Sequence, residues 1–111
     1  MEKGTEKEIK FSITAIHDID NIYVYSKDTF GERKANEYQN QILKLISQLS
    51  KWYLIHPQCR SLETKNRIYR SIIVESHLVI YKISQRIEIL RVLHAATSNT
   101  QIKNARKIKV D

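Results

Sequence analysis

The chain has 111 residues, of which 41% are hydrophobic and 28% charged, and this length suits one compact domain and excludes two of ordinary size. It has no apolar run near the roughly 18 residues of a membrane helix, no apolar N-terminal stretch typical of a signal peptide, and one cysteine, which excludes an internal disulfide. The net charge of +7 falls in residues 60–111, where eleven Lys and Arg oppose four Asp and Glu, and this is typical either of a surface for a polyanion or an acidic partner or of a merely solvated face.

The first third of the chain predicts a strand and then a helix, within a single cytoplasmic domain over residues 1–111. Residues 1–7 are expected to be a frayed polar lead. From Glu8 to Thr14 apolar and polar side chains alternate, as in a strand with one buried face. The stripe that starts at Ile16 recurs every three or four residues and predicts a helix, for which Thr14 is the expected N-cap.

A second helix is predicted after the break at Phe30 and Gly31. Its apolar stripe runs from Ala35 to Leu49, which is about five helical turns. The short joint between the two helices indicates an antiparallel helical hairpin. Pro57 ends this region in a loop over residues 55–59.

Strands are predicted in most of the remaining chain, because β-branched and aromatic residues dominate there. The short joints between them indicate an antiparallel meander. The last two strands are apolar on both faces, so each face needs a cover, and the second cover is either the C-terminal tail or a partner. The expected strands are residues 60–63, 68–75, 77–83 and 86–94.

The basic tail, residues 95–111, completes the expected architecture. Ser98 or Asn99 could cap a short helix that runs through Lys107; otherwise the tail is disordered until it is bound. The predicted fold class is α+β: an N-terminal strand and an antiparallel helical hairpin packed on a mostly antiparallel sheet of four to five strands.

The side chains that could carry chemistry are basic and aromatic. No His or Cys spacing matches a metal site and no glycine-rich loop could hold a phosphate, so neither a metal nor a cofactor is expected. Arginine can clamp phosphate and tyrosine can stack on a base, although tyrosines on strands are more often core residues. Arg70 alternates with apolar residues and is equally suited to a structural role. The set is Lys65, Arg67, Tyr69, Arg70, Tyr81, Arg91 and His94.

Residues 8–94 resemble the RelE/ParE superfamily of type II toxin–antitoxin toxins. The segment IYRSIIVESHLVIYKISQRIEILRVLH is similar to the family's hairpin and last strand, and ITAIHDIDNIYVYSKDTFGERKANEYQNQI is similar to its two helices. The likeness is greatest to ParE-like plasmid stabilisation toxins, and it implies a RelE/ParE-like fold.

Two activities occur in this superfamily, and the resemblance separates them. RelE-like members are ribosome-dependent, metal-free mRNA endonucleases. Their upstream arginine is replaced here at Leu78 and Val79, and Ala95 stands where their terminal tyrosine would be. If the chain were a ribonuclease, the catalytic candidates would be Arg70, Arg91 and His94.

ParE-like members inhibit DNA gyrase and have no agreed catalytic centre, and the phrase IEILRVLH is closest to theirs. Many of them carry an arginine directly after this histidine, where this chain has Ala95. The leading interpretation is a gyrase inhibitor. The alternatives are a ribonuclease that acts on mRNA at the ribosome and a degenerate, non-toxic binding protein on the same scaffold.

The resemblance also implies a cognate antitoxin that wraps the toxin and neutralises it, and the expected assembly is a homodimer or a toxin–antitoxin hetero-oligomer. The expected antitoxin contacts are Ile19, Tyr23, Ile42 and Ile46, which belong either to a groove on the helical hairpin or to the core. The expected contacts to the target or to a nucleic acid are Lys65, Arg67, Tyr69 and Tyr81.

Overall fold

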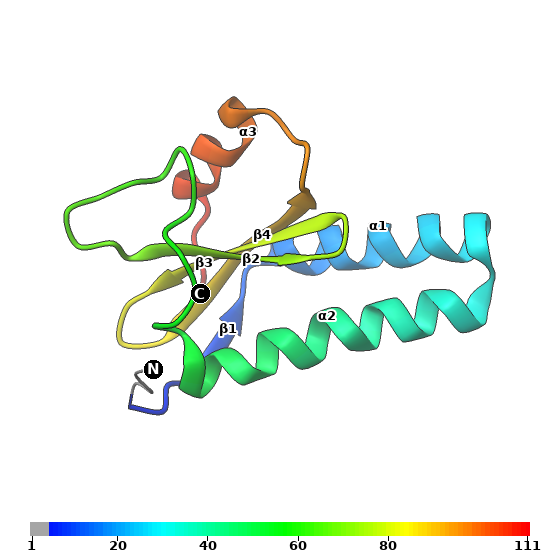
Figure 1. Ribbon diagram of the computed structural model, residues 1–111, viewed down its shortest axis with the longest axis horizontal. Helices are drawn as coiled ribbons and strands as arrows, with labels where there is room; N and C mark the ends of the chain where they lie inside the picture. Colours follow the sequence, from blue (N-terminus) through cyan, green and yellow to red (C-terminus); the bar gives the residue numbers. More distant parts are fainter. Residues whose placement is uncertain (1–4) are drawn as a thin grey trace.

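A helical hairpin lies beside a twisted four-stranded sheet in the computed structural model, which describes residues 5–111 (Figure 1). The sheet order is β1-β4-β3-β2, with β1 parallel to β4 and the other pairs antiparallel. This confirms the predicted α+β class and the mostly antiparallel sheet. The elements are β1 (Ile9–Phe11), α1 (Ile13–Phe30), α2 (Glu32–Trp52), β2 (Tyr69–Val74), β3 (His77–Ile83), β4 (Ile87–His94), α3 (Asn99–Asn104) and a 3-10 turn, Ala105–Lys107.

The first helix begins earlier than the sequence predicts, and Ser12, not Thr14, is its N-cap. The buried Ser12 hydroxyl accepts a hydrogen bond from the Ala15 N–H at 2.8 Å and donates one to the Leu90 carbonyl, also at 2.8 Å. One side chain therefore satisfies a free N–H of the helix and joins the helix to β4. The predicted strand stops at Phe11 because the chain turns into the helix at this serine.

Gly31 joins the two helices, as the break in the sequence predicts. Its φ of 94° is one that side-chain-bearing residues rarely adopt. Its N–H donates to the Lys27 carbonyl at 3.0 Å, and its own carbonyl accepts from the Ala35 N–H at 3.1 Å. The same residue thus closes α1 and opens α2, which folds the helices into a hairpin.

The sheet is covered on both faces by different parts of the chain. The hairpin covers one face, where Ile42, Ile46 and Leu49 of α2 pack with residues such as Val79 and Ile89. The other face is covered by the long loop after α2 and by the C-terminal tail. The second cluster contains Cys59, Leu62, Tyr69, Leu78, Ile80, Leu90, Leu93, Ile102 and Ala105. The tail folds as α3, with Ser98 as N-cap, and the following turn. It is therefore the second cover that strands with two apolar faces require.

The predicted strand over residues 60–63 is wrong. These residues form part of an irregular loop between α2 and β2, in which Ser61 has a φ of 67°. The loop turns sharply so that Cys59 and Leu62 both point into the second cluster. A single isolated bridge joins Gln58 to Arg70. Local β propensity is overridden here by the burial of two side chains that a straight strand could not direct into one core.

The described part of the N-terminal lead is held in place, which corrects the expected fraying for residues 5–7; residues 1–4 lie outside the described part. The Lys7 N–H donates to the Ser50 carbonyl at 2.8 Å, and the Tyr53 hydroxyl donates to the Thr5 carbonyl at 2.8 Å. Among the described residues, neither helix of the hairpin nor the short α3 has the length and apolar character that crossing a bilayer would demand.

Candidate functional site

Tyr81 and Tyr69 are core residues, so they cannot contact a target or a nucleic acid at the surface. The Tyr81 side chain is completely buried in the middle of β3, and its hydroxyl donates to the Tyr53 carbonyl at 2.6 Å. Burial raises the pKa of Tyr81 well above that of a free tyrosine. Tyr69 is packed in the second cluster. Tyrosines on strands are more often core residues, as expected from the sequence, and both tyrosines have that role here.

Arg70 holds the long loop. Its guanidinium donates to three carbonyls, those of Arg67 (2.7 Å), Leu54 (3.0 Å) and His56 (2.9 Å). The positive charge beside His56 adds to the effect of burial, and together they lower the pKa of that imidazole. Three of its five N–H donors are bound to backbone carbonyls of the loop, which gives Arg70 a structural role there.

Arg91 joins the sheet to the first helix. Its Nε and Nη2 atoms contact the two carboxylate oxygens of Asp18 at 2.7 and 3.0 Å, and Asp18 also accepts from the Val92 N–H at 3.0 Å. A two-point contact of this kind is among the strongest that arginine makes. The pair fixes α1 on β4, which gives both side chains a structural role.

His94, at the end of β4, belongs to a small cluster that the sequence only partly predicted. It is level with His77 in the ladder, and the two rings lie edge to face with their centroids 5.7 Å apart. His77 Nδ1 lies 2.6 Å from the Tyr38 hydroxyl, which donates to the Val74 carbonyl at 2.8 Å. Since that proton is used, His77 Nδ1 acts as the donor to the tyrosine oxygen. Tyr38, on α2, was missed because only the fold brings it to the sheet.

The three ribonuclease candidates do not come together. Arg70 is level with Tyr81 in the sheet, whereas His94 is level with His77 and Val74, four residues further along β2. Arg91 is turned toward Asp18 on α1.

The His77 pKa is lowered by burial and by the neighbouring His94, which favours a neutral ring. His77 and Tyr38 line a hollow of about 470 Å³ with Tyr25, Phe30, Lys34, Glu37, Glu75 and others.

Cys59 is a core residue. The Cys59 thiol is completely buried, and burial raises its pKa, so it is a poor nucleophile. Within residues 5–111 no three His, Cys, Asp or Glu side chains are close enough to hold a metal ion.

The predicted antitoxin contacts are mostly in the core. Ile19, Ile42 and Ile46 are buried between the hairpin and the sheet, so these three cannot contact a partner on the folded surface; this corrects their assignment to a groove. Tyr23 is half-buried and reaches the surface. The core alternative, which the sequence left open, therefore holds for the three isoleucines.

A different apolar stripe on α1 is exposed. Ile13, Ile16 and Val24 are 65%, 46% and 55% exposed, and their spacing of three and eight residues places them on one side of the helix, with the exposed Asp20 between Ile16 and Val24. The sequence carried a signal for it, because α1 has more large apolar residues than one buried face can accommodate. This stripe is a candidate surface for a protein partner.

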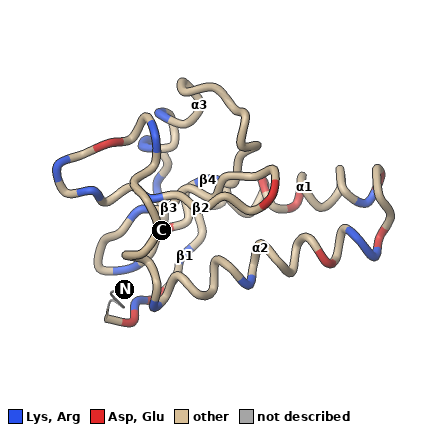
Figure 2. Tube along the Cα trace, viewed as in Figure 1, with Lys and Arg blue, Asp and Glu red and all other residues tan. Residues whose placement is uncertain are grey.

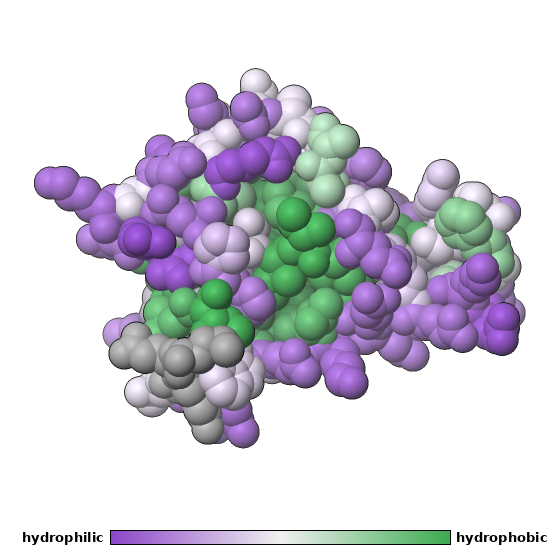
Figure 3. Space-filling model, in the orientation of Figure 1, coloured by the Kyte–Doolittle hydropathy of each residue, from purple (hydrophilic) through white to green (hydrophobic). Residues whose placement is uncertain are grey.

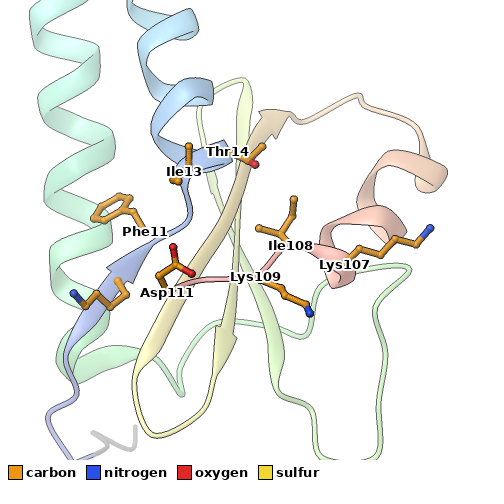
Figure 4. A pocket seen from close by; sticks show the side chains of 8 residues that line it. Phe11, Ile13, Thr14, Lys107, Ile108, Lys109 and Asp111 are labelled. Atoms are coloured by element: carbon orange, nitrogen blue, oxygen red, sulfur yellow. The ribbon is translucent and has the colours of Figure 1, made fainter.

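The stripe begins at a hollow of about 470 Å³ between the start of α1 and the C-terminal tail (Figure 4). Phe11, Ile13 and Ile108 provide apolar surface, and lysines stand around it on both sides. An apolar strip beside positive charge suits an amphipathic segment with acidic flanks. The lining residues are Lys10, Phe11, Ile13, Thr14, Lys107, Ile108, Lys109 and Asp111.

Lys65 and Arg67 are exposed on the long loop, as a role in target binding requires. Arg67 has a φ of 53°, and its carbonyl is held by Arg70. Of the four residues predicted to contact a target, these two remain available at the surface.

Comparison with known proteins agrees with this fold. A sequence model of the family described as the ParE toxin of the type II toxin–antitoxin system parDE matches residues 9–98. Toxin ParE1 of Caulobacter vibrioides is 32% identical over 89 residues, which cover 79% of this chain and 88% of that protein. A solved structure, of a chromosomal ParDE toxin–antitoxin system from P. aeruginosa, superposes with a TM-score of 0.68 at 20% identity. That match covers 82% of this chain and 98% of the other.

The extent of the family match, from β1 through the end of β4 and into the tail, includes the hairpin, the sheet and the exposed stripe of α1. The chain therefore belongs to the ParE family of type II toxin–antitoxin toxins.

Proposed function

We propose that the protein is a cytoplasmic toxin that inhibits DNA gyrase by binding and is neutralised by a cognate antitoxin. The proposal is carried by the hydrogen bonds that the basic and aromatic residues of the strands make within the fold. Arg70, Arg91 and Tyr81 are occupied by hydrogen bonds within the fold. A metal-free ribonuclease needs an acid, a base and a cation that converge on one phosphate, whereas Arg70 and Arg91 bind at different places in the fold and Tyr81 is buried.

The antitoxin is proposed to bind along the exposed stripe of α1. Ile13, Ile16 and Val24 supply apolar surface, and Lys107 and Lys109 of the tail supply positive charge at one end. An acidic amphipathic segment would bury the apolar surface of α1 and neutralise the positive charge of the tail. Such a segment would become ordered as it binds. The expected product is a toxin–antitoxin hetero-oligomer.

The function is tested by pulse-labelling after induction of the chain in a bacterial host without antitoxin. Thymidine incorporation should fall first, with filamentation of the cells, because gyrase inhibition stops replication. Amino-acid incorporation that collapses within minutes while DNA synthesis continues would refute the proposal and support the ribonuclease. If neither changes, the chain is a non-toxic binding protein.

A purified system then separates the target from indirect effects. With gyrase, relaxed plasmid and ATP, the added chain should reduce supercoiling or cause cleaved plasmid to accumulate, and the antitoxin should reverse this. Unimpaired supercoiling at an excess of the chain would show that gyrase is not the target.

The antitoxin surface is tested with Val24→Glu and Ile16→Glu. Each places a charge within the proposed apolar contact and should weaken copurification with the antitoxin by at least about tenfold, which corresponds to about 1.4 kcal/mol. Ile73→Glu is the matched control, because Ile73 is at least as exposed as Ile16 and Val24 but lies on the edge strand β2. Equal loss in all three variants, or in none, would remove α1 as the binding surface.

A further inference from the structure

The positive charge of the molecule is concentrated outside the helical hairpin. Residues 13–52 contain five Lys and Arg and five Asp and Glu, so the hairpin region has no net charge. Residues 53–111 contain eleven Lys and Arg and four Asp and Glu. Figure 2 shows the blue segments of the long loop, of the β3–β4 turn and of the tail at the same end of the molecule.

Four of these eleven cations are used to hold the fold together. Arg70 and Arg91 bind the loop carbonyls and Asp18, as described above. Arg86 contacts Glu88 and donates to the carbonyls of Val110 and Asp111. Arg60 donates to the carbonyls of Ala95 and Thr97. A fifth cation, Lys82, is half-buried and is the cross-strand neighbour of Glu88.

The other six cations are all exposed, and none has an ion-pair partner within the described residues. Two lie on the long loop and four on the tail. We call them the cationic face: Lys65, Arg67, Lys103, Arg106, Lys107 and Lys109.

The packing of the tail directs three of its four cations outward. Ile102 and Ala105, three residues apart on the helical part, are buried in the second cluster, so Lys103 and Arg106 lie on the solvent side. Beyond Lys107 the chain is extended, Ile108 and Val110 pack against the same cluster, and Lys109 between them is exposed.

The loop and the tail are packed against each other. Arg60 on the loop also reaches the Asn99 side chain at 3.4 Å, in addition to its two bonds to tail carbonyls. Cys59 and Leu62 of the loop share the second cluster with Ile102 of the tail. Figure 3 shows that hydrophilic side chains cover the surface over the loop and α3.

The chemistry of this surface fits a phosphate backbone and lacks the parts that other anionic partners need. Tyr69 and Tyr81, the two tyrosines of residues 54–111, are buried, and this range has no phenylalanine or tryptophan, so the cationic face offers none of these large rings to unpaired bases. The single large apolar side chain exposed beyond residue 56 is Ile73, which is too little to anchor in a lipid surface.

We infer that the cationic face binds the phosphate backbone of double-helical DNA. Its six free lysines and arginines are carried by a loop and a tail that are fixed to each other, so the charges are held in place before binding. The choice of a double helix follows from the buried tyrosines, and the choice of DNA over RNA rests on the proposed action on gyrase. The antitoxin stripe on α1 meets this face at Lys107 and Lys109.

The test is fluorescence anisotropy of the full chain with a labelled 30-base-pair duplex at several salt concentrations, in the absence of gyrase. The variant Lys103→Glu/Arg106→Glu/Lys107→Glu should lose at least tenfold in affinity at low salt. The slope of its log association constant against log salt concentration should become less negative by about 2 to 3, because each phosphate contact contributes about 0.9 to that slope. Circular dichroism confirms that the variant is folded.

The matched control is Lys27→Glu/Arg33→Glu/Lys44→Glu, which makes the same change of net charge with the same residue types on exposed positions of the hairpin. It should keep affinity within about twofold to threefold of the parent chain. Equal loss in both triple variants would mean that net charge alone governs binding and would overturn the inference.

Competitors identify the partner. Unlabelled duplex DNA should displace the probe, whereas a single strand of equal length, an RNA duplex and polyglutamate should do so more weakly. Preference for the single strand or the RNA duplex would overturn the assignment to double-helical DNA, and preference for polyglutamate would indicate an acidic protein. DNA binding without gyrase inhibition would uphold this inference while the proposed function fails.

Discussion

Arg70 is of a residue type that often binds phosphate, but in this fold it has a structural role. Its alternation with apolar residues was compatible with a structural role, and the structure gives it three loop carbonyls as acceptors. Tyr81 is similar: a tyrosine in a family motif became a core residue whose hydroxyl reaches the Tyr53 carbonyl. In both cases backbone carbonyls accept the hydrogen bonds. For the buried Tyr81 hydroxyl this is necessary, because a buried donor without a partner is costly.

Tyr81→Phe is expected to lower the free energy of unfolding by about 1 kcal/mol, the typical cost of a lost buried hydrogen bond. The ring is retained, so the packing of the core is unchanged and toxicity should persist at permissive temperature. Urea unfolding followed by circular dichroism measures the first effect. A variant as stable as the parent would show that the bond to Tyr53 contributes nothing.

His77 predicts a pH dependence of stability. Burial and His94 lower its pKa in the folded chain, and burial and Arg70 do the same for His56. The unfolded chain then binds more protons below its ordinary pKa of about 6.5. Stability is therefore full above about pH 6.5 and falls as the pH drops through the lowered folded values.

This pH dependence is measured as the melting temperature of the chain and of His77→Gln between pH 7.5 and pH 5. The melting temperature of the parent should fall further than that of His77→Gln between pH 7.5 and pH 5. His17→Gln, which replaces an exposed histidine on α1, is the control and should behave like the parent. Identical curves for the parent and His77→Gln would mean that the folded state does not resist protonation at this ring.

At the scale of the elements, Ser12 decides where the strand ends and the first helix begins. Alternation of apolar and polar residues continues past it in the sequence, so a longer strand was the reasonable interpretation. The hydroxyl, however, caps the helix and bonds to β4 at the same time. A residue that joins two elements across 78 positions of sequence cannot be recognised from its local neighbours.

Ser12→Ala is expected to cost about 1 to 2 kcal/mol of stability, because the helix loses its cap and the Leu90 carbonyl loses a donor. Thr14→Ala, at the N-cap position that the local pattern suggested, should cost less than about 0.5 kcal/mol. Chemical denaturation of the two variants side by side compares them directly. A larger loss from the threonine variant would contradict the assigned cap.

At the scale of the whole molecule, the sheet is stable only because both faces are covered. The hairpin provides one cover, and the tail provides the other through Ile102 and Ala105. Arg60 and Arg86 fasten the tail at its two ends, at Ala95 to Asn99 and at Val110 to Asp111. The tail is thus part of the folded domain as well as the carrier of four surface cations.

Ile102→Ala should lower the free energy of unfolding by about 2 to 5 kcal/mol, since a completely buried side chain is removed from a packed cluster. Lys103→Ala, at the adjacent exposed position, should change it by less than about 0.5 kcal/mol. Thermal and urea unfolding give both values. If the isoleucine variant were as stable as the parent, the tail would not be a structural cover.

The sequence by itself determined the first strand, the two helices and the last three strands in their order, the break at Gly31, the need for a cover on each face of the last two strands and the uneven charge. These depend on local periodicity and composition, whereas the strand predicted over residues 60–63 does not exist. It could not decide which isoleucines of α1 are inside, which acceptors the arginines reach or that the loop and tail meet. Those features depend on contacts between residues far apart in the chain. Only the tertiary structure separates Ile19 in the core from Ile16 at the surface, and Arg70 in the loop from Arg67 on the cationic face.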